Sequence, residues 1–127
     1  MARVVTQQQA RDLGLPGRRS LELVSRELGQ GSMTLRLVEI PVAVSGETPR
    51  APHRHTRTEE CIFVLSGQGT THADSGEFAL RAGDTIVIPR GEWHVTRNTG
   101  AEPLVLLCFF PVAEVGPGTE QAAAGRQ

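Results

Sequence analysis

Three histidines and one glutamate in this chain have the types and spacing of a transition-metal site. His53 and His55 are separated by one residue, and side chains at i and i+2 of an extended segment point to the same side. Glu60 follows closely, and His94 comes shortly after a Pro-x-Gly turn. Three imidazoles and one carboxylate suit Fe, Mn, Co, Ni, Cu or Zn better than Ca or Mg. We therefore expect these four residues to bind one divalent transition-metal ion per chain; the alternative is that the histidines are ordinary residues of surface loops.

The segments that must position these residues carry strand signals. Alternating or β-branched runs, separated by glycine and proline turns, cover residues 32–44, 60–67, 84–89, 94–98 and 103–112. The last of these runs is almost continuously apolar, which is typical of a strand buried on both faces. Many short strands with closely spaced turns and almost no helix predict an all-β barrel or sandwich.

Each motif occurs once, so a single barrel with short extensions is expected from the 127 residues. Residues 1–19 form a polar N-terminal arm, in which Thr6 and Gln9 match the capping box of one short helix. The barrel is expected over residues 20–112, and residues 113–127 are expected to be a flexible C-terminal tail.

Composition limits the partners and the location. A net charge of −1, with 39% hydrophobic and 21% charged residues, indicates a globular protein without the basic surplus that nucleic acid or an anionic membrane requires. No secretory signal or run of membrane-spanning length is visible, so a cytoplasmic location is expected. Cys61 and Cys108 lie in apolar runs without a CxxC pair and are expected to be buried, reduced thiols.

The spacing of the candidate ligands resembles the two motifs of the cupin family. The first motif, a Gly, an HxH, a Glu and a second Gly, is matched by Gly46, His53-Arg54-His55, Glu60 and Gly67, with six residues before the HxH where five are usual. The second motif is matched without departure by Gly83, Pro89, Gly91, His94 and Asn98. The resemblance covers residues 30–112 and implies a cupin jelly-roll β-barrel with a metal inside.

Glu59 competes with Glu60 for the role of carboxylate ligand. Only Glu60 keeps the six-residue gap to Gly67 that the cupin motif has. Strand alternation then places Glu60 and Ile62 on one face and Cys61 on the other, so a thiolate ligand is not expected. Glu60 is also the candidate catalytic carboxylate, either staying bound to the ion or dissociating to act as a base.

Two further residues are candidates for contacts with a substrate. Arg36 lies in the middle of a strand and would hold a substrate carboxylate if its face is the barrel interior; otherwise it is solvated or packs against a partner subunit. Asn98 has the same parity as His94 and either faces inward behind the ligands or is a turn residue at the strand end.

The chain contains no tyrosine and no lysine, which removes side chains on which several cupin enzymes rely for acid–base chemistry. The resemblance therefore favours an Fe(II) dioxygenase acting on a small chelating organic substrate. One alternative is a redox-neutral cyclase, isomerase or lyase, for which Glu39, Glu92 and His72 are the candidate bases. The other is a non-catalytic module that binds a small molecule. A homodimer is expected, with residues 20–40 contributing to its interface.

Overall fold

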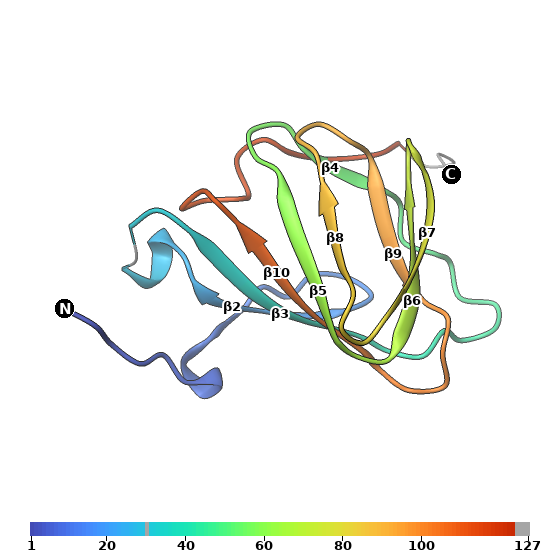
Figure 1. Ribbon diagram of the computed structural model, residues 1–127, viewed down its shortest axis with the longest axis horizontal. Coiled ribbons are helices and arrows are strands. Elements are labelled where there is room, and N and C mark those ends of the chain that lie inside the picture. The colour runs from blue at the N-terminus through green and yellow to red at the C-terminus, as the bar shows by residue number, and fades with distance from the viewer. Residues whose placement is uncertain (30, 124–127) are drawn as a thin grey trace.

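The computed structural model describes residues 1–29 and 31–123, which form two antiparallel sheets packed face to face (Figure 1). The six-stranded sheet has the order β1 (Arg11–Asp12), β2 (Arg19–Val24), β3 (Thr34–Ile40), β10 (Leu104–Phe110), β5 (Glu60–Ser66) and β8 (Thr85–Ile88). The five-stranded sheet has the order β11 (Thr119–Gln121), β4 (His53–His55), β9 (His94–Asn98), β6 (Gln68–Ala73) and β7 (Gly76–Arg81). This architecture confirms the expected all-β jelly roll.

Helical structure is minor. The described residues contain two single-turn 3-10 helices, η1 (Gln7–Gln9) and η2 (Arg26–Leu28), and the capping box of Thr6 and Gln9 forms at the first. None of the described helices has the length and apolar character that a membrane span requires.

Alternation along the strands fixes the inner and outer faces of the six-stranded sheet. In β5, Glu60, Ile62 and Val64 are buried, while Cys61 is half-buried and Phe63 is exposed on the other face. The expected alternation, with Glu60 and Ile62 on one face of β5 and Cys61 on the other, is therefore confirmed. Both cysteines are free thiols. Cys61 is less buried than expected because it lies on the outer face. The inner face continues in a core of Val38, Ile40, Ile62, Val64, Leu80, Ile88, Leu104, Leu106, Cys108, Phe110 and Val115.

The apolar run of β10 is buried on one face only within this chain. Leu104, Leu106 and Phe110 are at most 2% exposed, whereas Phe109 on the outer face is 39% exposed. The expectation of burial on both faces is wrong for the isolated chain, because none of the described residues forms a second layer over the outer side of β10.

Both chain ends are more structured than expected. In the arm, β1 pairs with β2, with Arg11 opposite Glu22, so the polar arm adds an edge strand to the sheet. Beyond the barrel, Ala113 and Val115 are buried and β11 pairs with β4. The predicted flexible tail is thus wrong for residues 113–121, because the open edge of β4 offers backbone partners to a segment that has no strand pattern of its own. Residues 124–127 of that expected tail lie outside the described residues.

Candidate metal centre

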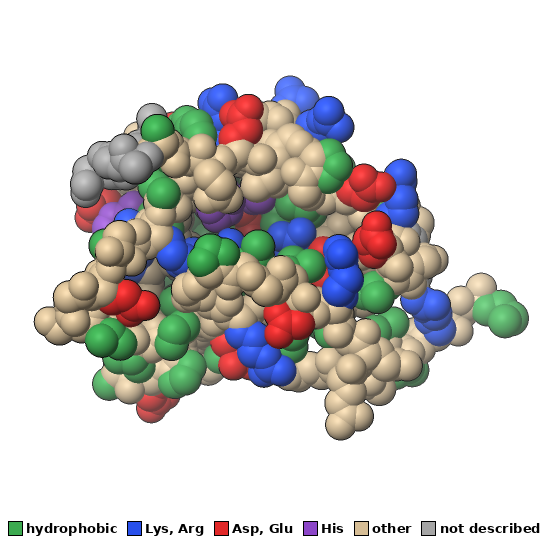
Figure 2. Space-filling model, turned by 180° about the vertical axis from the view of Figure 1, so that it is seen from behind, with side chains coloured by type: hydrophobic (Ala, Val, Ile, Leu, Met, Phe, Trp, Pro, Cys, Tyr) green, Lys and Arg blue, Asp and Glu red, His purple; other side chains and the backbone are tan. Residues whose placement is uncertain are grey.

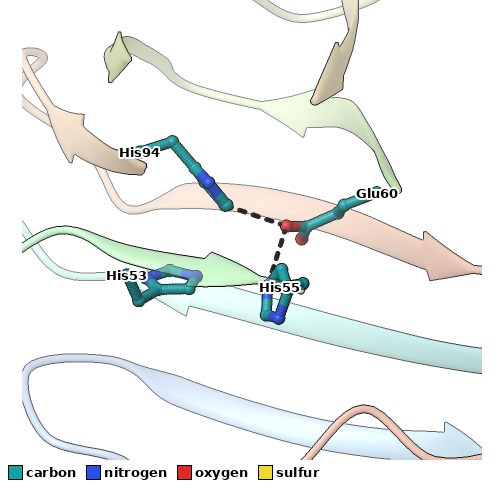
Figure 3. A group of neighbouring side chains, drawn as sticks. All are labelled: His53, His55, Glu60 and His94. Atoms are coloured by element: carbon teal, nitrogen blue, oxygen red, sulfur yellow. Dashed lines mark hydrogen bonds and ion pairs between the residues drawn. The ribbon is translucent and has the colours of Figure 1, made fainter. Parts of the chain in front are cut away.

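The four predicted ligands come from three strands that belong to both sheets (Figure 3). His53 and His55 lie on β4, and His53 is directly opposite His94 of β9. Glu60 begins β5 in the other sheet. Gly91, with a φ of +87°, lets the turn before β9 bend back so that its N–H donates to the His55 carbonyl at 2.8 Å. The turn therefore locks His94 onto the strand that carries the other two histidines.

The four side chains converge on one point. One ligand atom from each of His53, His55, Glu60 and His94 lies within 4.8 Å of the others. The carboxylate oxygen Oε1 of Glu60 lies 3.0 Å from Nε2 of His94 and 3.4 Å from Nε2 of His55. The His53 ring is nearby, with its centroid 4.4 Å from that of His94. The predicted ligand set is thus assembled in one place.

Hydrogen bonds on the far side of two rings determine which nitrogen faces the centre. Nδ1 of His94 lies 3.0 Å from the Glu92 carbonyl, which can only accept, so Nδ1 carries a proton. Nδ1 of His55 lies 3.0 Å from the Thr119 hydroxyl, which itself donates to the Val115 carbonyl at 2.6 Å. That hydroxyl therefore accepts from Nδ1 of His55, and both histidines present Nε2 to the centre, as metal-bound histidines usually do.

One buried atom shows that these residues fit a metal ion. Nε2 of His55 is inaccessible to solvent, and although it lies 3.4 Å from Oε1 of Glu60, it forms no hydrogen bond with any described residue. A buried polar nitrogen without a partner costs free energy, and the nearby Glu60 carboxylate and two further imidazoles supply the other donors that a transition metal takes. The donor chemistry and the unsatisfied nitrogen both indicate a cation site.

Metal binding requires neutral histidines and an ionised glutamate, and the electrostatics favour these states at His53 and Glu60 but not at His94. Burial lowers the pKa of His53 to about 3, aided by the neighbouring His94, so the His53 imidazole is neutral near pH 7. Burial alone would raise the pKa of Glu60, but its contacts with His55 and His94 hold that pKa well below its usual range. For His94, burial opposes the charged form, yet the hydrogen bond to Glu60 raises its pKa overall. Glu60 is therefore a carboxylate at neutral pH.

The ligands line a cavity of about 250 Å³, and Figure 2 shows histidine and arginine side chains inside a hollow on this face of the molecule. Phe110 lies edge-on to His55, with ring centroids 5.1 Å apart.

Arg36 also lines the cavity, so of the two predicted orientations its side chain takes the one that faces the barrel interior. Its Nε donates to Glu22 at 3.1 Å, and the same carboxylate accepts from Arg11. The charge of Arg36 is thus matched by a buried glutamate.

Asn98 lies away from the cavity lining, at the end of β9. Its side-chain amide donates to the carbonyls of Ile40 and Glu102 at 3.0 and 2.7 Å, and its oxygen accepts from the Gly100 N–H at 2.8 Å. These bonds fix the turn after β9, which corresponds to the turn-residue alternative of the prediction. They leave Asn98 no contact with the site.

The three candidate bases lie outside the cavity lining too. Glu39 pairs with Arg19 at 3.5 Å, Glu92 accepts from the Ser75 N–H at 3.1 Å, and His72 lies 3.2 Å from Glu77. Each is therefore occupied by a surface contact.

Sequence reasoning missed several residues of the site. Leu13, Leu15 and Arg18 of the N-terminal arm line the cavity, as does Arg50 from the connection between β3 and β4. Thr119, which orients His55, lies in the segment expected to be a flexible tail. A polar arm and a glycine-rich segment give no periodic signal, so only the folded chain reveals these contacts.

Comparison with known proteins identifies relatives over the same region. The cupin domain family model matches residues 37–110, more than half of the chain. An uncharacterised protein of Methanocaldococcus jannaschii is 38% identical over 72 residues, covering 57% of this chain and 56% of that protein. Germin-like protein subfamily 1 member 10 of Arabidopsis thaliana is 34% identical over 102 residues, covering 75% of this chain and 44% of that protein. The chain thus spans about half the length of the curated relatives it matches.

Solved structures share the fold at low sequence identity. Streptomyces Pac13, described as a nucleoside dehydratase and solved with uridine, has a TM-score of 0.77 at 15% identity, covering 96% of this chain and 91% of that one. A formate complex of oxalate decarboxylase from Lactobacillus farciminis has a TM-score of 0.74 at 21% identity, covering 90% of this chain and 34% of that one. The family-model match and the jelly-roll barrel with its buried His/Glu group lead to one conclusion: the chain belongs to the cupin domain family.

Proposed function

We propose that this cupin is a metal-dependent enzyme, an Fe(II) dioxygenase acting on a small chelating organic molecule. His53, His55, Glu60 and His94 would hold the ion. The observation that carries the proposal is the buried Nε2 of His55, which has no hydrogen-bond partner among the described residues and faces a carboxylate and two imidazoles inside a cavity.

The protein's own contribution is to hold the ligands and shape the cavity. The Glu92 carbonyl and the Thr119 hydroxyl fix the orientation of His94 and His55. Apolar side chains, including Val38, Ile62, Leu106 and Phe110, line the cavity beside the ligands and offer an apolar wall to a bound substrate. When bound, an Fe(II) ion supplies redox chemistry and charge stabilisation that no side chain provides.

The cavity lining favours redox chemistry over proton transfer. Among the described residues that line it, the titratable side chains besides the four ligands are three arginines and Cys108. Burial raises the pKa of the Cys108 thiol well above its usual value, so it stays protonated. The candidate bases Glu39, Glu92 and His72 lie elsewhere, as described above. A redox-neutral reaction would therefore depend on Glu60 for both metal binding and proton transfer.

Oxygen uptake tests this proposal. Metal-free protein loaded anaerobically with Fe(II) is screened with enols, catechol-like diols and 2-oxo acids, each of which can chelate an ion through two oxygens. We expect O2 consumption only with a suitable substrate, none with Zn(II) protein, and none with the His94→Ala variant. Full activity of Zn(II) or Ni(II) protein under nitrogen would replace the dioxygenase with a redox-neutral isomerase, cyclase or lyase. Binding of these molecules without turnover by any metal form would indicate a non-catalytic binding module.

We also propose a homodimer formed through the outer face of the six-stranded sheet. Strand pairing places Leu35 beside Phe109, Leu37 beside Leu107, and Leu107 beside Phe63. Residues directly opposite in a pair share a face, so these outward side chains form a continuous apolar surface, here called the outer apolar patch. It consists of Leu35, Leu37, Phe63, Val87, Leu107 and Phe109. Its β3 residues fall within the expected 20–40 interface, and a second copy would bury the outer side of β10.

A further inference from the structure

Two arginines in the metal cavity form no ion pair with an acidic residue in the described part of the chain. Arg18, directly before β2, and Arg50, between β3 and β4, both line the cavity and are both half-buried. Among the described residues, neither guanidinium lies within ion-pair distance of a carboxylate. The third arginine of the cavity, Arg36, differs because it forms an ion pair with Glu22 at 3.1 Å.

Local structure holds both guanidiniums in place. Arg18 donates to the Pro16 carbonyl at 2.9 Å, and Arg50 donates to the Thr96 carbonyl. Gly17 has a φ of +73°, and a Cβ atom there would lie 2.7 Å from Cδ of Arg50, so the turn of the arm rests directly on the Arg50 side chain. Each guanidinium carries five N–H donors, and the side-chain bonds above use one donor of each. Both arginines are therefore positioned, with donors to spare.

The arrangement is electrostatically unfavourable without an anion. Burial, together with the nearby Arg18 and Arg97, lowers the pKa of Arg50 to about 10. Burial and Arg36 also lower the pKa of Arg18. Both groups remain charged at neutral pH, and a partly buried charge without a partner costs free energy that an anionic ligand would offset. Arginine forks match the planar geometry of a carboxylate.

We propose that Arg18 and Arg50 form a subsite that binds a carboxylate of the substrate. The substrate is then a small organic acid: one end chelates the metal, and the carboxylate at the other end contacts these two arginines. This inference rests on the proposed function, since it assigns the second half of the same substrate. The modest cavity volume of about 250 Å³ suits a small acid of this kind.

Two matched ligands test the subsite. Protein loaded with Co(II) is titrated with 2-oxoglutarate and, separately, with 2-oxovalerate. The two ligands have the same chelating end, but 2-oxovalerate has a methyl group in place of the distal carboxylate. Binding is measured from changes in the Co(II) absorption bands. We expect 2-oxoglutarate to bind about 10- to 100-fold more tightly, the range for hydrogen bonds to a charged group. Arg18→Gln and Arg50→Gln should each remove most of this preference while leaving the affinity for 2-oxovalerate unchanged. Equal affinities in the unmodified protein would overturn the proposal.

Controls separate the subsite from folding and from the metal site. Arg81→Gln, on the exposed edge strand β7, should leave the preference intact, and Arg50→Lys should restore part of it because the charge is kept. Failure to bind Co(II) would count against the proposed function alone. In that case the melting temperature of metal-free protein is measured with and without glutarate. If glutarate raises the melting temperature of the unmodified protein but not that of Arg18→Gln, the subsite is supported. If glutarate does not raise the melting temperature of the unmodified protein, the subsite is refuted.

Discussion

The two sheets of this barrel share the same alternation of inner and outer residues but differ in what each face does. The outer face of the six-stranded sheet is apolar, with Phe63 and Phe109 each 39% exposed and Val87 60% exposed. The outer face of the five-stranded sheet is polar: Arg54 of β4 pairs with Glu120 of β11 at 2.6 Å. One sheet is therefore suited to a protein partner and the other to solvent.

The inner faces differ as well. The six-stranded sheet contributes most of the apolar core and a single candidate ligand, Glu60. The five-stranded sheet contributes all three histidines, and its inner face also carries a buried Thr71–Thr96 hydrogen bond of 2.7 Å. The candidate metal centre thus joins a polar sheet to an apolar one.

The strongest test of this division replaces a histidine of the five-stranded sheet. His94→Ala should lower the metal content below about one ion per chain, because it removes one of the four donors and leaves only His53, His55 and Glu60 to hold the ion. Elemental analysis of protein purified without chelator measures this. His72→Ala, a change on the same sheet outside the cavity lining, is the control and should keep full metal content. Unchanged metal content in His94→Ala would show that His94 is not a ligand.

A change at the one ligand from the six-stranded sheet is the next test. Glu60→Gln keeps the shape of the side chain but removes the charge that His55 and His94 contact, so metal content should fall strongly. Glu59→Gln, an exposed neighbour on the same segment, should have little effect. The reverse result would show that Glu59 is the ligand, and with it that the strand alternation of β5 is misassigned.

The outer faces are compared by placing a charge on each. Phe63→Glu, within the outer apolar patch, should convert the proposed dimer to a monomer, because an ionised carboxylate cannot be buried there without a partner. Thr70→Glu on the five-stranded sheet, opposite Arg97, is the control and should leave the assembly unchanged. Light scattering at micromolar concentration distinguishes the two. An unmodified protein that is already monomeric would contradict the dimer.

The smallest expected effect concerns the hydroxyl behind His55. Thr119→Val removes the acceptor for Nδ1 of His55 and should weaken metal binding by about 10- to 100-fold, the range for such supporting contacts. A competition titration with a chromophoric chelator measures the affinity. Thr70→Val, which lies away from the cavity lining, is the matched control. Equal affinity in both variants would show that the β11 segment covers the site without orienting it.

The sequence by itself indicated which four residues are candidate ligands, and it indicated that His53 and His55 share one side of their strand. His53 and His55 are two residues apart, and alternation is a local property of an extended backbone, so their common side follows without knowledge of the fold. The cupin-like spacing to Gly67 selected Glu60 as the inward carboxylate, and alternation then placed Cys61 on the opposite, outer face, as the structure has it. Alternation left the orientation of Arg36 open, because it shows which side chains share a face of the strand but not which face is the barrel interior.

Only the tertiary structure decided what closes the barrel and completes the cavity. The segment 119–121 has no apolar pattern, yet it forms β11 because the edge of β4 leaves backbone groups unpaired. Arg18 and Arg50 are distant in the sequence and meet because the arm folds back over the open end, with Gly17 against the side chain of Arg50. Such contacts depend on which edges and openings the rest of the chain leaves uncovered, and no local pattern encodes that.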